Sequence, residues 1–553
     1  MLGKGVRVVL CFAWALGGCS RILGLEPPEP WLESDASAGG GGVAGSAGDA
    51  GSSGNAGDAG ASGVAGGAGQ SGGSGGTGGE DGGSEDGGDA GCKASEKSCG
   101  SGCVAVNDPA FGCTPQGCEP CALDHATAEC NVTACAVADC AAEWGDCDGE
   151  PENGCEEDLT LGPAARCNGK VAETCAVGGQ WTEEECGIDC ESGSCLQVVD
   201  LAAGGAHTCA VLSNDEVWCW GDNGKGQLGI GTTNPPSSTS PKLVQGLSTA
   251  EQVSLAMSST CVVNPAKELR CWGDNDAGQL GTGSNIALLA PHSGPTLTSI
   301  DRVDAGTWNT ACVLGEDKVR CFGGPMGSFQ PGVNPTEVPG ASGPHLAVGT
   351  GFACAGSEAG LKCWGNGGSG QLGNGEPPQS SGTPVSVSLQ VPWAGVGSGD
   401  ASSYAFTTAG EVYAWGGNSH GQLGAGQLGD ASVPTKVLLP VSVDQILRVD
   451  GGFRHGCVHG RDNADEDVVY CFGSNNHGTL GQGTLSGSSN VPVLVMAGPG
   501  SPLQASRVAV GWEHACALVS DGKEIVCWGL NEKGQLGDGT NTSQGYPVRV
   551  VFP

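Results

Sequence analysis

The sequence predicts an all-β protein whose C-terminal part is a seven-bladed β-propeller. An aromatic residue followed by glycine recurs seven times, at intervals of 42 to 57 residues. Polar turns separate segments of strand length, and no long segment shows helical periodicity. The seven aromatic residues are Trp220, Trp272, Phe322, Trp364, Trp415, Phe472 and Trp528.

Each repeat is expected to supply one blade. A strand such as 207–212 is followed by a polar turn, a strand such as 216–221, and a glycine-rich GQLG or GTLG turn in six of the units. An apolar strand flanked by proline, such as 434–439, closes most units. One such unit cannot bury both of its faces alone, whereas a closed ring covers each sheet and leaves few exposed edges.

Paired cysteines support this reading, because two of them flank the first hairpin turn in six of the seven units. Positions equally distant from a hairpin turn lie opposite each other, which suits a disulfide. The fifth unit has Tyr404 and Ala414 there, so both cysteines are missing together. Buried free thiols are the alternative. The proposed disulfides are Cys209–Cys219, Cys261–Cys271, Cys312–Cys321, Cys354–Cys363, Cys457–Cys471 and Cys516–Cys527.

The runs AGGAHTCAVLSNDEVWCWGDNGKGQLGIG at 203–231 and VGWEHACALVSDGKEIVCWGLNEKGQLGDGT at 510–540 resemble the regulator-of-chromosome-condensation repeat. The resemblance covers about 198–553. It implies a seven-bladed propeller with loops on two faces, closed by pairing of 547–551 with the strand near 198–203. Unit three departs from the pattern at 327–331 and unit six at the acidic insertion 461–467. These departures form either a specific surface or exposed loops that have drifted.

The N-terminus resembles a bacterial lipoprotein signal. Lys4 and Arg7 precede a short apolar run and the sequence Leu-Gly-Gly before Cys19. The expectation is a signal peptide at 1–18, lipidation of Cys19 and, because Ser20 follows it, sorting to the outer membrane. An ordinary secretory signal is the alternative.

Two further segments precede the propeller, which is expected at 197–553. Residues 19–91 are rich in Gly, Ala, Ser and Asp and predict a disordered tether. Residues 92–196 hold 16 cysteines and predict a small disulfide module whose connectivity the sequence leaves open.

Metal sites have two candidates, both in the module. A Cys-x-x-Cys pair at 118–121 suits a disulfide better than zinc in an exported protein. Partial calcium-loop spacing is carried by Asp146, Asp148, Glu150 and Glu157. Pro151 stands where an EF-hand loop needs glycine, so a solvated acidic loop is the alternative. No metal and no cofactor is therefore assigned.

Charge limits the partners. The chain has 60 acidic and 23 basic residues, a net charge of −37, which repels nucleic acid. No catalytic residue is identified. His207, His455 and His514 share one repeat position, where a structural hydrogen bond in each blade is expected rather than catalysis or metal binding.

The expected function is that of an exported, lipid-anchored envelope protein that binds a protein or glycan through its propeller loops without catalysis. A monomer is expected, with membrane contact through the anchor only. The alternative is an envelope hydrolase or lyase acting on polysaccharides. The founder of the resembled family is a guanine-nucleotide exchange factor. That activity is disfavoured here, because export separates the protein from cytosolic GTPases and fold alone does not give function.

Overall fold

The computed structural model describes residues 165–176, 180–292, 297–357 and 360–553, together with short strands between Glu96 and Asp158. The expected signal peptide at 1–18, Cys19 and the tether at 19–91 lie outside the described residues. So do Cys118, Cys121, Asp146, Asp148 and Glu150, and Glu157 is described only as part of a strand. In the described part of the chain, no helix meets the length and hydropathy of a membrane span. Its helices η3 (Asn476–Gly478) and η4 (Ser520–Gly522) have three residues each.

The cysteine-rich region is built of short antiparallel pairings. The pairs are β1 (Glu96–Cys99) with β2 (Gly102–Ala105), β3 (Ala126–Asn131) with β4 (Ala134–Cys140), and β5 (Trp144–Gly145) with β6 (Glu157–Asp158). A three-stranded sheet follows, of β7 (Ala165–Asn168), β8 (Val171–Ala176) and β9 (Gln180–Glu185). Then come β10 (Cys190–Glu191) and β11 (Ser194–Cys195). Disulfides Cys167–Cys190 and Cys186–Cys195 staple this last segment.

From residue 198 onward seven antiparallel sheets follow one another along the chain. Blade one has β12 (Val198–Ala203), β13 (His207–Leu212), β14 (Val217–Asp222) and β15 (Ser237–Leu243). Blade two has β16 (Gln252–Leu255), β17 (Ser259–Val263) and β18 (Leu269–Gly273), and isolated bridges to Leu288 and Leu297 replace its fourth strand. Blade three has β19 (Arg302–Gly306), β20 (Thr310–Gly315), β21 (Lys318–Gly323) and β22 (Gly332–Glu337).

The remaining four blades each have four strands. Blade four has β23 (His345–Gly349), β24 (Phe352–Ser357), β25 (Gly360–Gly365) and β26 (Ser381–Ser386). Blade five has β27 (Gly395–Ser398), β28 (Ser402–Phe406), β29 (Val412–Gly416) and β30 (Ala431–Lys436). Blade six has β31 (Val443–Gly451), β32 (His455–Asp462), β33 (Asp467–Ser474) and β34 (Ser488–Leu494). A small pair, β35 (Met496–Gly498) and β36 (Ser501–Pro502), precedes blade seven with β37 (Arg507–Val510), β38 (His514–Val519), β39 (Glu524–Gly529) and β40 (Gln544–Arg549).

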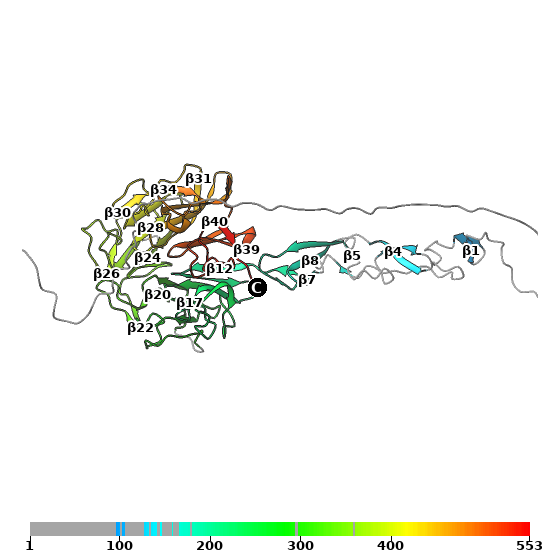
Figure 1. Ribbon diagram of the computed structural model, residues 1–553, viewed down its shortest axis with the longest axis horizontal. Coiled ribbons are helices and arrows are strands. Elements are labelled where there is room, and N and C mark those ends of the chain that lie inside the picture. The colour runs from blue at the N-terminus through cyan, green and yellow to red at the C-terminus, as the bar shows by residue number, and fades with distance from the viewer. Residues whose placement is uncertain are drawn as a thin grey trace, which may run out of the picture. The chain divides into compact units, whose positions relative to one another are not determined.

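The first strand of every blade contacts the first strand of the next, so the seven first strands line the centre of a ring (Figure 1). The contact of β12 with β37 closes this ring between blades one and seven. The all-β, seven-bladed propeller predicted from the repeats is confirmed. The strand expected at 434–439 instead starts at Ala431, because Ala431 pairs with Gly416 across a β-bulge.

The expected closure by pairing of 547–551 with the strand near 198–203 is wrong. β40 pairs with β39 inside blade seven, and β12 pairs with β13 inside blade one. The reason is that each terminal blade is complete from contiguous sequence. Side-chain packing holds the seam instead, where the Phe552 ring lies edge-on to Trp218 and Trp220, at centroid distances of 5.9 and 6.2 Å.

The aromatic–glycine signature has a backbone cause. The glycine adopts a positive φ in every blade, for example 99° at Gly221, where the third strand bulges between Cys219 and Gly221. A Cβ on Gly221 would lie 2.4 Å from the carbonyl oxygen of Ala206. Glycine is therefore required there, both for its conformation and for the close approach of the neighbouring turn.

Disulfides join the second and third strands in six blades. Each pairs residues that face each other across the hairpin, with Cα atoms 4.0 to 4.1 Å apart. The bonded pairs are the six proposed from the repeats, Cys209–Cys219, Cys261–Cys271, Cys312–Cys321, Cys354–Cys363, Cys457–Cys471 and Cys516–Cys527. In blade five Tyr404 faces Ala414 and both are fully buried. Such a set of disulfides indicates an oxidising, extracytoplasmic location.

The last part of the cysteine-rich region packs against the propeller. Ile188 and Leu196 share an apolar cluster with Leu201 and Ile525. In addition, the Lys523 ammonium lies 2.5 Å from a Glu184 carboxylate oxygen. The propeller therefore gains part of its core from residues that precede its first strand.

Replacing both members of one blade disulfide is expected to destabilise the protein. The double variant Cys261→Ala/Cys271→Ala removes a short cross-link, which should lower the free energy of unfolding by about 2–3 kcal/mol. Denaturant unfolding without reductant, compared with the unsubstituted chain, measures this change. An unchanged midpoint in the double variant would show that the disulfide does not stabilise the blade.

Candidate functional site

Strand topology divides the propeller's loops between two faces. Because the strands are antiparallel, the turn between strands one and two lies on the same face as the loop between strands three and four. We call this the mouth face. The opposite face, called here the hairpin face, carries the turn between strands two and three and the connection to the next blade.

A recurring asparagine builds the large loops of the mouth face. In blade seven the amide nitrogen of Asn531 donates to the carbonyl oxygens of Thr540 and Thr542, each at 3.1 Å. Its amide oxygen accepts from the Leu536 backbone N–H at 3.0 Å. The same role falls to Asn223, Asn275, Asn418 and Asn475. These asparagines were not predicted from the sequence, although each stands three positions after the repeat aromatic.

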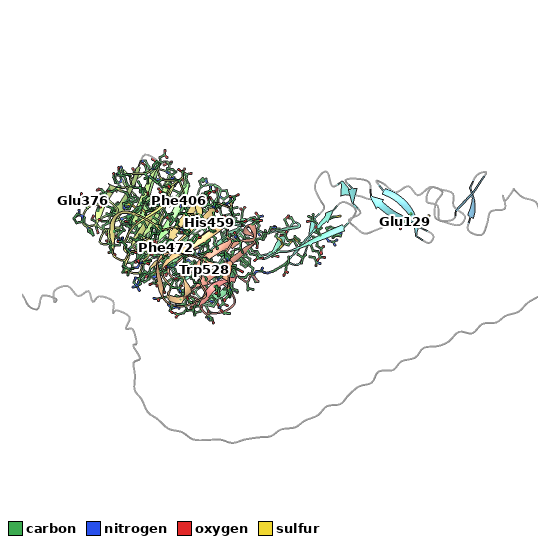
Figure 2. All side chains as sticks on the ribbon, turned by 90° about the horizontal axis from the view of Figure 1, so that it is seen from above. Glu129, Glu376, Phe406, His459, Phe472 and Trp528 are labelled. Carbon is green, nitrogen blue, oxygen red and sulfur yellow. A yellow bond between two sulfur atoms is a disulfide. The ribbon has the colours of Figure 1, made fainter. Side chains whose placement is uncertain are left out.

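The GQLG and GTLG turns connect neighbouring blades. The indole N–H of Trp272 donates to the backbone carbonyl of Gln227 at 3.0 Å, and that of Trp528 donates to Thr479 at 3.0 Å. Trp528 and Phe472, labelled in Figure 2, occupy the same repeat position in adjacent blades and are fully buried. Phenylalanine has no N–H, and at that junction the Tyr404 hydroxyl donates to the Gln422 carbonyl at 2.8 Å.

The repeated histidines are structural groups with defined tautomers. The Thr208 hydroxyl donates to the Gln535 carbonyl, so it accepts a hydrogen bond from Nε2 of His514 at 2.9 Å. His207 meets Thr260 of the next blade in the same way at 3.0 Å. These contacts confirm the expected hydrogen bond for two of the three histidines.

His455 differs from the other two. Its Nε2 is buried without a partner, because Ala515 replaces the threonine in the next blade. The expected hydrogen bond in each blade is therefore wrong at this position. Burial lowers the pKa of His455 to about 4, and it lowers those of His207 and His514 to about 3. The lowered pKa values favour the neutral form of all three imidazoles at physiological pH.

The two departures from the repeat lie on opposite faces and do not form one site. Unit three lacks the GQLG turn on the mouth face, and the Trp364 indole N–H of the following blade is buried without a partner. The insertion at 461–467 extends the hairpin of blade six on the other face. Arg461 lies 3.2 Å from both Asp465 and Asp467, while Asp462 and Glu466 have no basic partner there, so the insertion keeps a net negative charge.

Backbone hydrogen bonds tie together the turns around the centre of the mouth face. Trp512 N–H donates to Gly204 O at 3.0 Å, and Phe453 N–H donates to Trp512 O at 2.9 Å. Asp400 N–H donates to Gly452 O, also at 2.9 Å. Each bond joins neighbouring blades, so these turns form a rigid rim rather than independent loops.

Aromatic side chains project from this rim. The rings of Phe453 and Trp512 lie 4.9 Å apart, and the Arg454 guanidinium stacks 4.4 Å from the Phe453 centroid. Trp308, on the corresponding turn of blade three, is 63% exposed. A large exposed aromatic on a rigid turn is the kind of group that anchors a partner. The sequence signal was available, since none of these aromatics belongs to the repeated aromatic–glycine position.

A cavity of about 490 Å³ runs between the seven first strands. Its polar side chains link the strands. Asp200 of blade one accepts from the Val253 N–H of blade two at 2.8 Å, and Asp304 of blade three accepts from the Val348 N–H of blade four at 3.0 Å. Burial raises the pKa of Asp304 to about 6. These carboxylates satisfy strand edges that would otherwise lack hydrogen-bond partners.

Among the described residues, no group of three His, Cys, Asp or Glu side chains is arranged to hold a metal ion. The weak calcium candidate at 146–157 lies almost wholly outside that part of the chain.

Known proteins share the repeat. Two models of the regulator of chromosome condensation (RCC1) repeat match the chain, one at 198–227 and 505–535, the other at 214–263, 409–458, 466–518 and 524–553. The Ultraviolet-B receptor UVR8 of Arabidopsis thaliana is 28% identical over 363 residues, which are 65% of this chain and 70% of the receptor. The human E3 ubiquitin-protein ligase HERC2 is 26% identical over 369 residues, 66% of this chain but only 7% of HERC2.

Solved structures share the fold. Prp20p from Saccharomyces cerevisiae, described with its binding properties to Gsp1p and histones, superposes with a TM-score of 0.53 at 20% identity, over 61% of this chain and 85% of Prp20p. Yeast RCC1 (Prp20) in a complex with Kap60 gives 0.52 at 21% identity, over 61% and 83% of the two chains. Identities at this level establish a common fold and no common partner.

Removing one loop asparagine should loosen one loop. In Asn531→Ala, the Leu536 N–H and two carbonyls lose their partner, and we expect a loss of about 1–3 kcal/mol in stability. Hydrogen exchange should show faster exchange confined to 536–543. Asn214→Ala is the matched control, because Asn214 makes only a 3.3 Å bond to the Glu216 N–H. Equal effects of the two substitutions would contradict the assigned role.

The buried histidines should make the protein less stable in acid. The unfolded chain takes up protons below about pH 6.5, whereas the folded His455 does so only near 4, so stability falls between these values. Asp304 acts in the opposite direction, because its folded pKa is raised.

His455→Gln removes one titrating group without removing a hydrogen bond from Nε2. Between pH 6.5 and 4.5 this variant should lose about 2 kcal/mol less stability than the unsubstituted chain. Denaturant unfolding at several pH values measures the difference. His292→Gln, at an exposed residue, is the control, and identical profiles for all three proteins would refute the assignment.

Proposed function

We propose that this seven-bladed propeller of RCC1 repeats is a non-catalytic recognition scaffold that binds a protein or glycan through its mouth face. The observation that carries the proposal is the rim. Backbone hydrogen bonds between blades fix the turns that present Phe453 and Trp512. The turn that presents the exposed Trp308 meets the next blade through the hydroxyl groups of Thr307 and Thr350. Pre-organised aromatic anchors lose little conformational entropy on binding. The hairpin face carries the acidic insertion 461–467, in which Arg461 pairs with two of the four acidic residues, and this loop has no aromatic side chain to anchor a partner.

The proposed location is the cell envelope. The disulfides place the folded part in an oxidising compartment. The finer proposal, a monomer tethered to the outer membrane through lipidated Cys19, rests on the sequence of the first twenty residues.

Catalysis is the second candidate, and one observation bears on it. Asp304 sits in the central cavity with a pKa raised to about 6, as a general acid requires. Its oxygen and those of Asp200 and Asp450 are nevertheless engaged by backbone N–H groups of the first strands. A hydrolase or lyase would have to recruit carboxylates that the ring already uses, so we favour binding. Nucleotide exchange is disfavoured by the oxidising compartment.

Affinity capture tests the proposal. The bait is the full oxidised chain, because Ile188 and Leu196 contribute to the propeller core and a truncation that removes them would expose it. We expect a partner from solubilised envelope or secreted polysaccharide that is retained by the oxidised bait and lost by a reduced, unfolded bait. Trp308→Ser should weaken capture at least tenfold, since one anchor residue commonly carries about 2 kcal/mol.

Val441→Ser is the matched control, an exposed apolar residue between blades five and six on the hairpin face. Equal loss in both variants, or capture unaffected by changes at Trp308, Phe453 and Trp512 together, would exclude the mouth face. Turnover of a polysaccharide by the same bait would instead establish the catalytic candidate.

A further inference from the structure

Three arginines face the central cavity from one level of the ring. Arg302, Arg448 and Arg507 lie on β19, β31 and β37 and all line the 490 Å³ cavity. In each of these blades, the residue two positions after the arginine pairs with the first cysteine of the blade disulfide. In blade three, for example, Asp304 pairs with Cys312. The same register in three blades places all three arginines along the wall of this one cavity.

The hydrogen-bonding capacity of these groups is largely unused. Nε of all three arginines is buried without a partner. Arg448 donates through one terminal nitrogen to Asp450 at 3.1 Å, and Arg507 pairs with Asp200. Arg302 lies within ion-pair distance of no carboxylate among the described residues. A guanidinium carries five N–H donors, so most of the donors in the cavity have no protein acceptor.

The carboxylates of the cavity, two of which pair with arginines, also bind backbone N–H groups. Asp200 accepts from the backbone N–H groups of Val253 and Leu201, at 2.8 and 3.0 Å. Asp304 accepts from Val348, and Asp450 accepts from the N–H of Gly451 at 3.1 Å. The formal charges of the three arginines and three aspartates cancel. The numbers of hydrogen-bond donors and acceptors do not balance. The three carboxylates accept from backbone N–H groups, whereas Nε of each arginine has no partner.

The electrostatics of the two paired arginines differ. For Arg448, burial is outweighed by the nearby carboxylates, which raise the pKa. Burial lowers the pKa of Arg507, and the positive charges of Arg448 and Arg302 lower it further, against the raising effect of Asp200. An anion among the three groups would relieve this repulsion. Two or three parallel N–H···O bonds from a guanidinium fork suit a planar carboxylate or a tetrahedral phosphate.

We propose that the central cavity is a binding site for a small oxyanion, either a phosphate or a carboxylate, held by Arg302, Arg448 and Arg507. The volume is ample, since one water occupies about 30 Å³ of liquid. A second cavity of about 450 Å³ is also lined by Arg302, which therefore borders both cavities. Asp301 and Asp317 line the second cavity as well, so its wall is less favourable to an anion than the arginine-lined central cavity.

The test uses the full oxidised chain and inorganic phosphate. We expect phosphate to raise the unfolding temperature above that in chloride of equal ionic strength, and to broaden its ³¹P resonance on addition of protein. Arg302→Gln should abolish both effects. Arg320→Gln, on the outer part of the same blade and paired with Glu316, is the matched control and should keep them.

A phosphate effect that is the same in Arg302→Gln and Arg320→Gln would overturn the proposal, as would an unbroadened ³¹P signal with the unsubstituted chain. Should Arg302→Gln fail to fold, Arg302→Lys keeps the charge without the planar fork and should weaken binding at least tenfold. Glucuronate in place of phosphate distinguishes the two sources of the anion. Displacement of phosphate by glucuronate at equal concentration would identify a sugar carboxylate as the preferred ligand.

Discussion

The ring depends on hydrogen bonds that cross from one blade to the next. A single four-stranded blade leaves a free edge on its first strand and an uncovered face, and neither is stable in water. The indole N–H groups of Trp220, Trp272 and Trp528 donate to backbone carbonyls in the GQLG or GTLG turn of the preceding blade in the ring, at 2.9 to 3.0 Å. The same loops are folded by the recurring asparagine. Hydrogen bonds between neighbouring blades therefore position both the buried aromatic residues and the loops of the mouth face.

Whereas these hydrogen bonds join neighbouring blades, disulfides stabilise single blades. They join two strands within a blade, so they stabilise each hairpin but do not fix one blade against another. The seam between blades one and seven has no shared sheet, and Phe552, Ile188 and Leu196 pack there instead. The residues just before the propeller thus take over part of the closing role that strand exchange was expected to supply.

Much of this architecture was predictable because repetition averages out local ambiguity. Seven aromatic–glycine positions and six cysteine pairs predict the number of blades and the hairpin register. Ring closure was not predictable. The repeat pattern does not decide whether the two terminal blades share a strand or whether each is completed from contiguous sequence, as it is here. The arginine cluster was also invisible, since Arg302, Arg448 and Arg507 come from distant segments that only the closed ring brings together.

Two surfaces of the propeller suit different kinds of ligand. The mouth face offers aromatic anchors fixed on a hydrogen-bonded rim, suited to a macromolecular partner. The cavity offers three buried guanidinium Nε donors without a protein partner, suited to a small anion. Neither surface depends on the histidines, whose depressed pKa values come from their burial between blades.

The most direct test of the central claim is a hydrogen-exchange footprint of the captured partner on the full oxidised chain. The account predicts slower exchange in the rim turns near residues 204–206, 307–309, 453–454 and 512–513, with the hairpin face unchanged. Protection restricted to the hairpin face, to the insertion at 461–467 or to the cysteine-rich region would contradict recognition through the mouth face.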